Sequence, residues 1–210
     1  MRRLLSIALF VAAAASATAL ADDLHRPDQA PGEAAQVEQG KALFAMCAGC
    51  HGAEGEGKIG VGPRLNSANY LAAAPNDFFE QTIVKGRAGT NMVAFGAGMP
   101  EENVDALVSY IRSWQTTPGA TLDEAPLRGD VATGDKLFND ICTTCHGGAG
   151  AGYSEAGSGT GIGRKGFLDV ASDGFLREVI RNGKDNTPMR SFDKDSPVTV
   201  ADLTDEEIDS

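Results

Sequence analysis

The stretch CAGCH at residues 47–51 occurs a second time, as CTTCH at residues 142–146. In each copy, two cysteines three positions apart would lie on the same side of one helical turn. A histidine follows directly, and this Cys-x-x-Cys-His spacing is typical of covalent c-type haem attachment. The thiols can bind the two vinyl groups on one porphyrin edge, and the histidine can ligate the iron. The predicted attachment residues are Cys47, Cys50, Cys142 and Cys145, and the predicted proximal ligands are His51 and His146.

Paired cysteines also serve other chemistry. A Cys-x-x-Cys pair can be a dithiol redox site or half of a zinc site, and four cysteines in an exported chain can form two disulfides. None of these requires a histidine directly after both pairs. The chain has three histidines, two of them in that position, and its four cysteines all belong to the two motifs. These counts favour two covalent haem c groups, each with iron.

The repeated motif resembles that of the class I cytochrome c family, in a two-haem, two-domain arrangement that covers the chain from about residue 33 to its end. The resemblance implies an all-α fold of two tandem cytochrome c-like helical domains, each wrapped around a covalent haem. It also implies that the first and last helices of a domain cross, where a glycine and an aromatic residue meet an aromatic of the last helix. In the first domain these residues would be Gly40, Phe44 and Tyr110.

The first 21 residues have the features of a secretory signal peptide. Arg2 and Arg3 precede an apolar run, which ends in the small-residue pattern Ala19-Leu20-Ala21. Cleavage near Ala21 would place the mature protein in the periplasm. The alternative is an uncleaved membrane anchor, but the run is short and rich in alanine for a span of about 20 apolar residues.

The chain is acidic, with 18 Lys and Arg residues against 29 Asp and Glu residues and a formal net charge of −11. Removal of the signal peptide would make the charge still more negative. Such a surface repels nucleic acid and attracts redox partners that carry a basic docking surface, with a strong dependence on salt. General solubility explains the charge equally well.

The rest of the chain divides into four segments. We predict a flexible lead-in at residues 22–35, a first cytochrome c domain at 36–115, a linker at 116–129 that contains proline and glycine, and a second domain at 130–210. The two domains align at an offset of 94 to 97 residues. Such a small drift in register indicates duplication of one unit.

Helical periodicity and capping residues predict the helices of the first domain. One helix should run from about residue 33 into the first cysteine motif, and another from 101 to 114. A short helix at 77–85 should begin at Asn76 as its cap and end at Gly86.

Methionine is the predicted second axial ligand of each iron. After the two proximal histidines only His25 remains, so bis-histidine ligation of both haems is impossible within one chain. Met189 is the one methionine of the second domain. Met92 and Met99 compete in the first, and the repeat selects Met92, because the pattern Thr-x-Met-x-x-Phe surrounds both Met92 and Met189.

A histidine ligand needs a partner for its other ring nitrogen. The Gly-Pro-x-Leu string at residues 62–65 resembles the cytochrome c loop whose proline carbonyl accepts this hydrogen bond, which would assign the role to Pro63. The glycine-rich stretch at 147–163 has no equivalent proline. The partner of His146 is therefore open.

The last residues, 203–210, have the pattern of the start of a last helix without its apolar body. We expect either a truncated sequence, which is slightly favoured, or a partner that supplies the missing surface. In both cases the face formed by Gly134 and Phe138 would have nothing in this sequence to cover it.

An iron with two strong axial ligands has no open position for a substrate, so its chemistry is one-electron exchange. We therefore predict a periplasmic dihaem c-type cytochrome that is not itself an enzyme. It would be a soluble carrier or the electron-transfer subunit of a membrane or dehydrogenase complex. The alternative is a dihaem enzyme with one labile haem ligand, resembling haem peroxidases or thiosulfate-oxidising cytochromes. The absence of a spare cysteine and the presence of a methionine for each iron disfavour it.

Overall fold

The computed structural model describes residues 26–155 and 157–210. This part of the chain is mostly helical and has one small two-stranded sheet. The predicted signal peptide, its cleavage site at Ala21 and the spare His25 lie outside the described residues. Among the residues described, no helix has the length and apolar character needed to cross a membrane.

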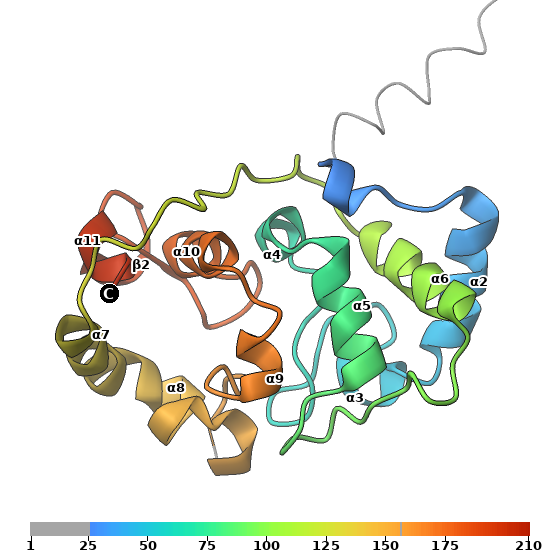
Figure 1. Cartoon of the computed structure of the whole chain (residues 1–210), viewed down its shortest axis with the longest axis horizontal. Coiled ribbons are helices and arrows are strands. Elements are labelled where there is room, and N and C mark those ends of the chain that lie inside the picture. The colour runs from blue at the N-terminus through green and yellow to red at the C-terminus, as the bar shows by residue number, and fades with distance from the viewer. Residues whose placement is uncertain (1–25, 156) are drawn as a thin grey trace, which may run out of the picture.

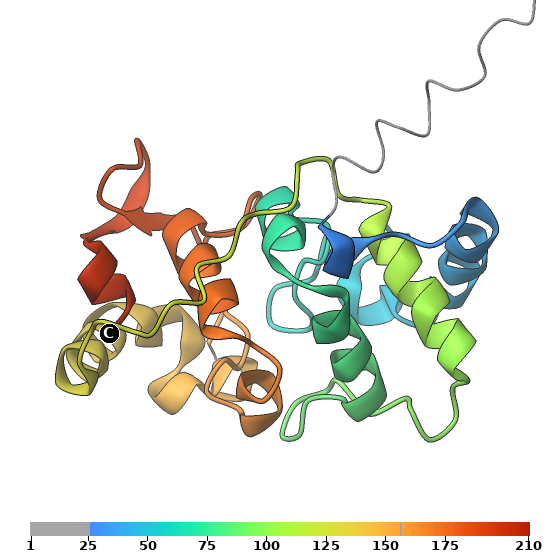
Figure 2. The same cartoon turned by 45° about the horizontal axis from the view of Figure 1, so that its top comes forward.

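The structure consists of two units that lie side by side, joined by an extended segment along one side (Figures 1 and 2). The first unit, residues 26–115, contains η1 (Pro27–Gln29), α2 (Ala34–Phe44), α3 (Ala48–His51), α4 (Ala68–Ala73), α5 (Asn76–Lys85) and α6 (Glu101–Arg112). The second unit, residues 130–210, contains α7 (Val131–Leu137), the π-helical turn η2 (Phe138–Cys142), α8 (Thr143–His146), η3 (Gly148–Gly150), η4 (Gly152–Glu155), α9 (Lys165–Leu168), α10 (Asp173–Asn182), β1 (Ser191–Asp193), β2 (Thr199–Leu203) and α11 (Asp205–Ile208).

Helices α2 and α6 cross at the centre of the first unit. Gly40 on α2 is buried, and a Cβ atom added to it would lie 1.8 Å from the carbonyl oxygen of Ala106 on α6. Only glycine fits this approach, because no side chain can be placed between the two backbones. Phe44 packs edge-on against Tyr110 and Trp114, with ring centroids 5.4 and 5.2 Å apart. The predicted crossing of the first and last helices is confirmed.

Helix α5 begins one residue before the predicted start. Pro75 is its N-cap, so Asn76 is the first helical residue and its prediction as the cap was wrong. The Asn76 side chain donates to the carbonyl of Ala30 and accepts a hydrogen bond from Nε of Arg112. Arg112 is fully buried, and its guanidinium needs acceptors because an unpaired buried charge is costly. Gly86 ends the helix with a φ of 64°, as predicted.

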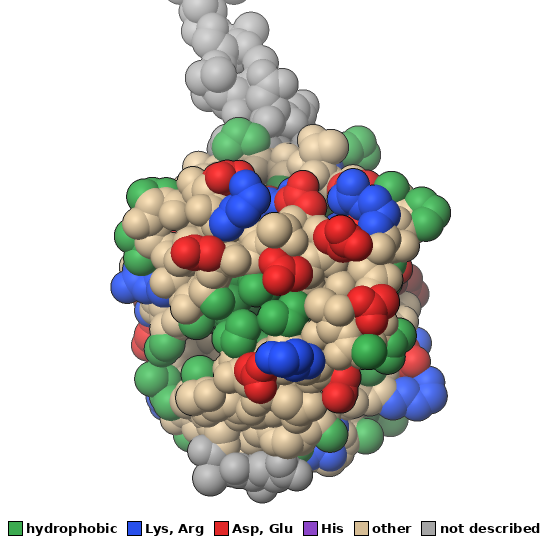
Figure 3. All heavy atoms as spheres, turned by 90° about the vertical axis from the view of Figure 1, so that its left-hand side faces the viewer, with side chains coloured by type: hydrophobic (Ala, Val, Ile, Leu, Met, Phe, Trp, Pro, Cys, Tyr) green, Lys and Arg blue, Asp and Glu red, His purple; other side chains and the backbone are tan. Residues whose placement is uncertain are grey.

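Helices α7 and α11 meet in the second unit much as α2 and α6 do in the first. A Cβ atom at Gly134 would lie 1.9 Å from the carbonyl oxygen of Ser210. The expectation that nothing covers Gly134 was therefore wrong, because Ser210, which follows the end of α11, already reaches it. Phe138 is half-buried and Val131 is 86% exposed. Figure 3 shows a patch of apolar side chains on this side of the molecule.

Strands β1 and β2 pair in parallel, and Ser191 lies opposite Thr199. The all-α prediction missed this pairing. Strands of three and five residues are too short to show an alternating pattern in the sequence.

Residues 116–129, the predicted linker, form no helix or strand but contact both units. The amide of Ala120 donates to the carbonyl of Ala72 in the first unit. The carboxylate of Glu124 accepts hydrogen bonds from the hydroxyl of Ser172 and the amide of Gly174 at the start of α10. The segment is therefore fixed at both ends.

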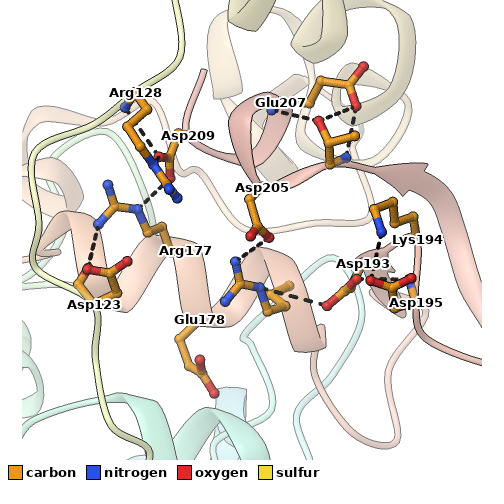
Figure 4. Close-up of polar contacts among 12 residues, drawn as sticks. Asp123, Arg128, Arg177, Glu178, Asp193, Lys194, Asp195, Asp205, Glu207 and Asp209 are labelled. Atoms are coloured by element: carbon orange, nitrogen blue, oxygen red, sulfur yellow. Dashed lines mark hydrogen bonds and ion pairs between the residues drawn. The ribbon is translucent and has the colours of Figure 1, made fainter.

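Replacement of Arg177 by methionine should cost up to about 3–5 kcal/mol of unfolding free energy, because it removes the buried partner of a buried carboxylate and leaves only the exposed Arg128 beside it. Arg177 on α10 is 4% exposed and bonds the carboxylate of Asp209, which is 1% exposed, at 2.5 Å (Figure 4). Denaturant unfolding measures the effect. Lys136→Met is the matched control: it breaks the pair with Asp140 at the surface, where solvent screens both charges, so it should change the stability far less.

The same pair should make the second unit sensitive to acid. Burial raises the pKa of Asp209, but hydrogen bonds from Arg177 and Arg128 outweigh it and hold the pKa below its ordinary value. The stabilisation is therefore complete above the ordinary carboxyl pKa of about 3.9 and is lost as the pH falls through the lowered one. Equal acid sensitivity of the wild type and Arg177→Met would contradict this assignment.

Candidate haem sites

Each cysteine motif forms a short helical turn, α3 in the first unit and α8 in the second. Cys47, Cys142 and Cys145 are half-buried and Cys50 is exposed. Burial, together with the neighbouring motif cysteine, raises the pKa of the Cys47 and Cys142 thiols. All four are free thiols, and the described residues contain no cluster of three or more Cys, His, Asp or Glu side chains that could hold a metal ion. The four sulfur atoms are therefore available for thioether bonds.

A backbone carbonyl orients each motif histidine. Nδ1 of His51 lies 2.9 Å from the carbonyl oxygen of Pro63, and Nδ1 of His146 lies 2.8 Å from that of Thr160. A carbonyl can only accept, so each Nδ1 carries the proton and each Nε2 keeps its lone pair for a metal. Burial lowers the pKa of His51, which favours the neutral, ligating form.

Thr160 is the partner of His146 that the sequence left open. It lies 97 residues after Pro63, the same offset that relates Met92 to Met189. The missing proline does not matter, because the histidine needs only a carbonyl oxygen. The repeat register could have found this residue.

Glycines bring both carbonyl loops close to the motifs. A Cβ atom at Gly62 would lie 2.7 Å from the carbonyl oxygen of Cys50. A Cβ atom at Gly159 would lie 2.9 Å from the imidazole ring of His146. Larger residues would push the loops off the histidines, so both sites fit a histidine-ligated haem iron.

The two predicted methionine ligands occupy equivalent turns. The amide of Met92 donates to Oγ1 of Thr90 at 3.1 Å, and the carbonyl of Met92 accepts a hydrogen bond from the amide of Arg87 at 2.8 Å. Met189 makes the same two bonds with Thr187 and Lys184, at 3.2 and 2.7 Å.

Burial does not distinguish Met92 from the competing candidate, Met99. Met92 and Met99 are both half-buried and pack against the hydrophobic core of the first unit, and Met189 is also half-buried. Met46 is 53% exposed. The assignment of Met92 and Met189 as iron ligands stays a prediction that rests on the repeated turn.

Two histidine-bearing cysteine motifs on a mostly helical chain, each histidine held by a carbonyl, define a dihaem c-type cytochrome. A comparison with protein families agrees. The chain belongs to the family described as cytochrome c oxidase, cbb3-type, subunit III, whose profile matches residues 35–111 and 129–209. Its two cytochrome c domains bind two covalent haem c groups.

Curated relatives include two proteins named cbb3-type cytochrome c oxidase subunit FixP. The chain is 32% identical to that of Azorhizobium caulinodans over 177 residues, covering 79% of this chain and 57% of the relative. It is 32% identical to that of Bradyrhizobium diazoefficiens over 158 residues, covering 70% and 51%. The chain thus spans about half the length of the curated relatives it matches.

Solved structures show weaker likenesses. A reducing HAO-like protein complex of Kuenenia stuttgartiensis matches with a TM-score of 0.47 and 25% identity, covering 82% of this chain and 91% of that chain. Cytochrome CL of Methylophaga aminisulfidivorans matches with a TM-score of 0.34 and 24% identity, covering 39% and 54%. Neither likeness is close enough to define a function.

Proposed function

We propose that this protein passes single electrons through two haems, each ligated by histidine and methionine, as the periplasmic electron-transfer subunit of a cbb3-type oxidase. One observation carries the proposal: both motif histidines are held by a carbonyl in the orientation that an iron ligand needs. The family match and the FixP relatives support the oxidase as the complex.

The residues of the chain have separate roles in this proposal. Cys47, Cys50, Cys142 and Cys145 hold the porphyrins by thioether bonds. His51 and His146 would ligate iron through Nε2, while the carbonyls of Pro63 and Thr160 fix their rings and increase their basicity. Met92 and Met189 would be the second iron ligands, and a methionine ligand raises the reduction potential. The haem iron supplies reversible one-electron oxidation and reduction.

The acidic composition supports a partner with a basic docking surface. Long-range attraction between unlike charges speeds encounter and is screened by salt. The rate of electron transfer to the oxidase should therefore fall as the ionic strength rises.

Electron delivery to an oxidase tests the proposal. The reduced holoprotein is mixed with membranes that contain a cbb3-type oxidase without its own subunit III, and its reoxidation by oxygen is followed optically. We expect reoxidation that depends on the membranes and slows in salt. Carbon monoxide should leave the spectrum of the reduced protein unchanged. A protein that stays reduced and binds carbon monoxide would point instead to a dihaem enzyme.

A further inference from the structure

Aromatic side chains from equivalent positions form the contact between the two units. Tyr70 and Phe78 come from α4 and α5, and Phe167 and Phe175 come from α9 and α10, each 97 residues further on. Ring centroids are 4.9 Å apart for Phe78 and Phe175, 5.6 Å for Tyr70 and Phe175, and 6.0 Å for Phe78 and Phe167. The interface is therefore pseudo-symmetric, with each unit presenting the same surface to the other.

A basic side chain crosses this interface in each direction. Arg87 and Lys184, again 97 residues apart, each follow the glycine that ends a helix. The guanidinium of Arg87 lies 5.7 Å from the ring centroid of Phe167 and donates to the carbonyl of Gly166. The ammonium of Lys184 lies 3.7 Å from the ring centroid of Tyr70.

The carbonyls that accept from Lys184 and Arg87 differ in how close they lie in sequence to the carbonyl that holds a motif histidine. Nζ of Lys184 donates to the carbonyl oxygen of Arg64 at 3.1 Å, and Arg64 directly follows Pro63, whose own carbonyl holds His51. Gly166, in contrast, lies six residues beyond the carbonyl that holds His146. Lys184 thus places a charge on the loop that holds the histidine of the other unit.

Lys184 is poorly solvated in this position. Burial, with Arg64 nearby, lowers the pKa of its ammonium to about 7, so the group is fully charged only in mildly acidic solution.

We propose that Lys184, a residue of the second domain, raises the reduction potential of the first haem, the one at His51. The proposal rests on the proposed function, because it takes His51 as an iron ligand. Reduction adds one electron to the iron, and a positive charge held in the poorly solvated interface beside its histidine favours that added electron. Because the amide of Lys184 also binds the carbonyl of Met189, the same residue contacts the ligand turn of its own haem.

Redox titration of three holoprotein variants in mildly acidic buffer, where the ammonium is protonated, tests the proposal. Lys184→Met removes the charge and the hydrogen bond, Lys184→Gln removes the charge and keeps a donor, and Lys184→Arg keeps both. We expect Met and Gln to make reduction of the first haem about tenfold less favourable, which is about 59 mV for one electron. Lys184→Arg should stay close to the wild type.

A surface lysine of the second domain supplies the control. Lys165→Met removes an exposed ammonium that pairs with Asp169, so it should leave the potential of the first haem unchanged. A Met92→His background identifies which titration step belongs to that haem. An unchanged first potential in both Lys184→Met and Lys184→Gln would overturn the proposal, as would equal shifts at both haems. Loss of haem or of the methionine charge-transfer band in the wild-type background would instead contradict the proposed ligands, so the two failures are distinguishable.

Discussion

Replacement of Met189 by alanine should remove about half of the weak far-red band of the oxidised protein. This band arises from charge transfer between a methionine sulfur and ferric iron, and two methionine-ligated haems contribute similar amounts. The haem at His146 would also become high-spin in part and bind carbon monoxide when reduced. Its potential should fall, because a methionine ligand raises it. Optical spectra of wild type and variant in the oxidised and reduced states give all three readouts.

Met99→Leu is the matched control, because Met99 is half-buried and packs against the core of the first unit as Met92 does. It should keep the full band, whereas Met92→Ala should lose about half of it. A full band in Met92→Ala together with a band reduced by about half in Met99→Leu would reverse the assignment within the first domain. No band in the intact protein would rule out methionine ligation at both haems.

Gly40→Val should destabilise the first unit by about 3 kcal/mol or more. The added Cβ atom would lie 1.8 Å from the backbone of α6 at Ala106 and 2.9 Å from Cβ of Tyr110. Since neither helix can move without opening the contacts of Phe44 with Tyr110 and Trp114, the strain cannot be relieved locally. Denaturant unfolding followed by the fluorescence of Trp114 reports on this crossing.

Gly98→Ala controls for the loss of a glycine, because a Cβ atom there would meet no heavy atom within 4 Å. This variant should unfold within about 0.5 kcal/mol of the wild type. A stability loss at Gly40 no larger than that at Gly98 would mean that α2 and α6 do not approach each other as closely as described.

Features with a side-chain signal could be predicted from the sequence. The cysteine motifs are recognised by their spacing, and the role of Gly40 at the helix crossing was implied by the family resemblance. Pro63 was identified through a family resemblance, and its carbonyl accepts the hydrogen bond of His51 as expected. For the cysteines and for Gly40, one residue type is required by the chemistry or the geometry.

Other features had no such signal. Any residue can offer a backbone carbonyl, so Thr160 could be found only through the repeat register. Asn76 was predicted to be a helix cap, but its side-chain oxygen accepts a hydrogen bond from the buried guanidinium of Arg112 instead. Arg112 is 36 residues away in sequence, so the local pattern could not indicate this bond. The bond from Lys184 to Arg64 spans 120 residues and depends on how the two units pack. Contacts of this kind are tertiary and leave no local pattern.

The pseudo-symmetric interface holds the two duplicated units in one arrangement. Two independent cytochrome domains on a flexible linker would hold their haems at variable separation. Here the aromatic contacts of Phe78 and Phe175 and the fixed ends of residues 116–129 favour one arrangement. We expect electron exchange between the two haems to be fast compared with electron exchange with partners.

Electron paramagnetic resonance of the oxidised holoprotein, integrated against its haem content, tests the central claim most directly. If histidine and methionine ligate both irons, all of the ferric iron should give low-spin signals, in two species of equal amount. A high-spin signal that accounts for one iron per chain would contradict the claim, because it would mean that one haem keeps an open or water-bound face.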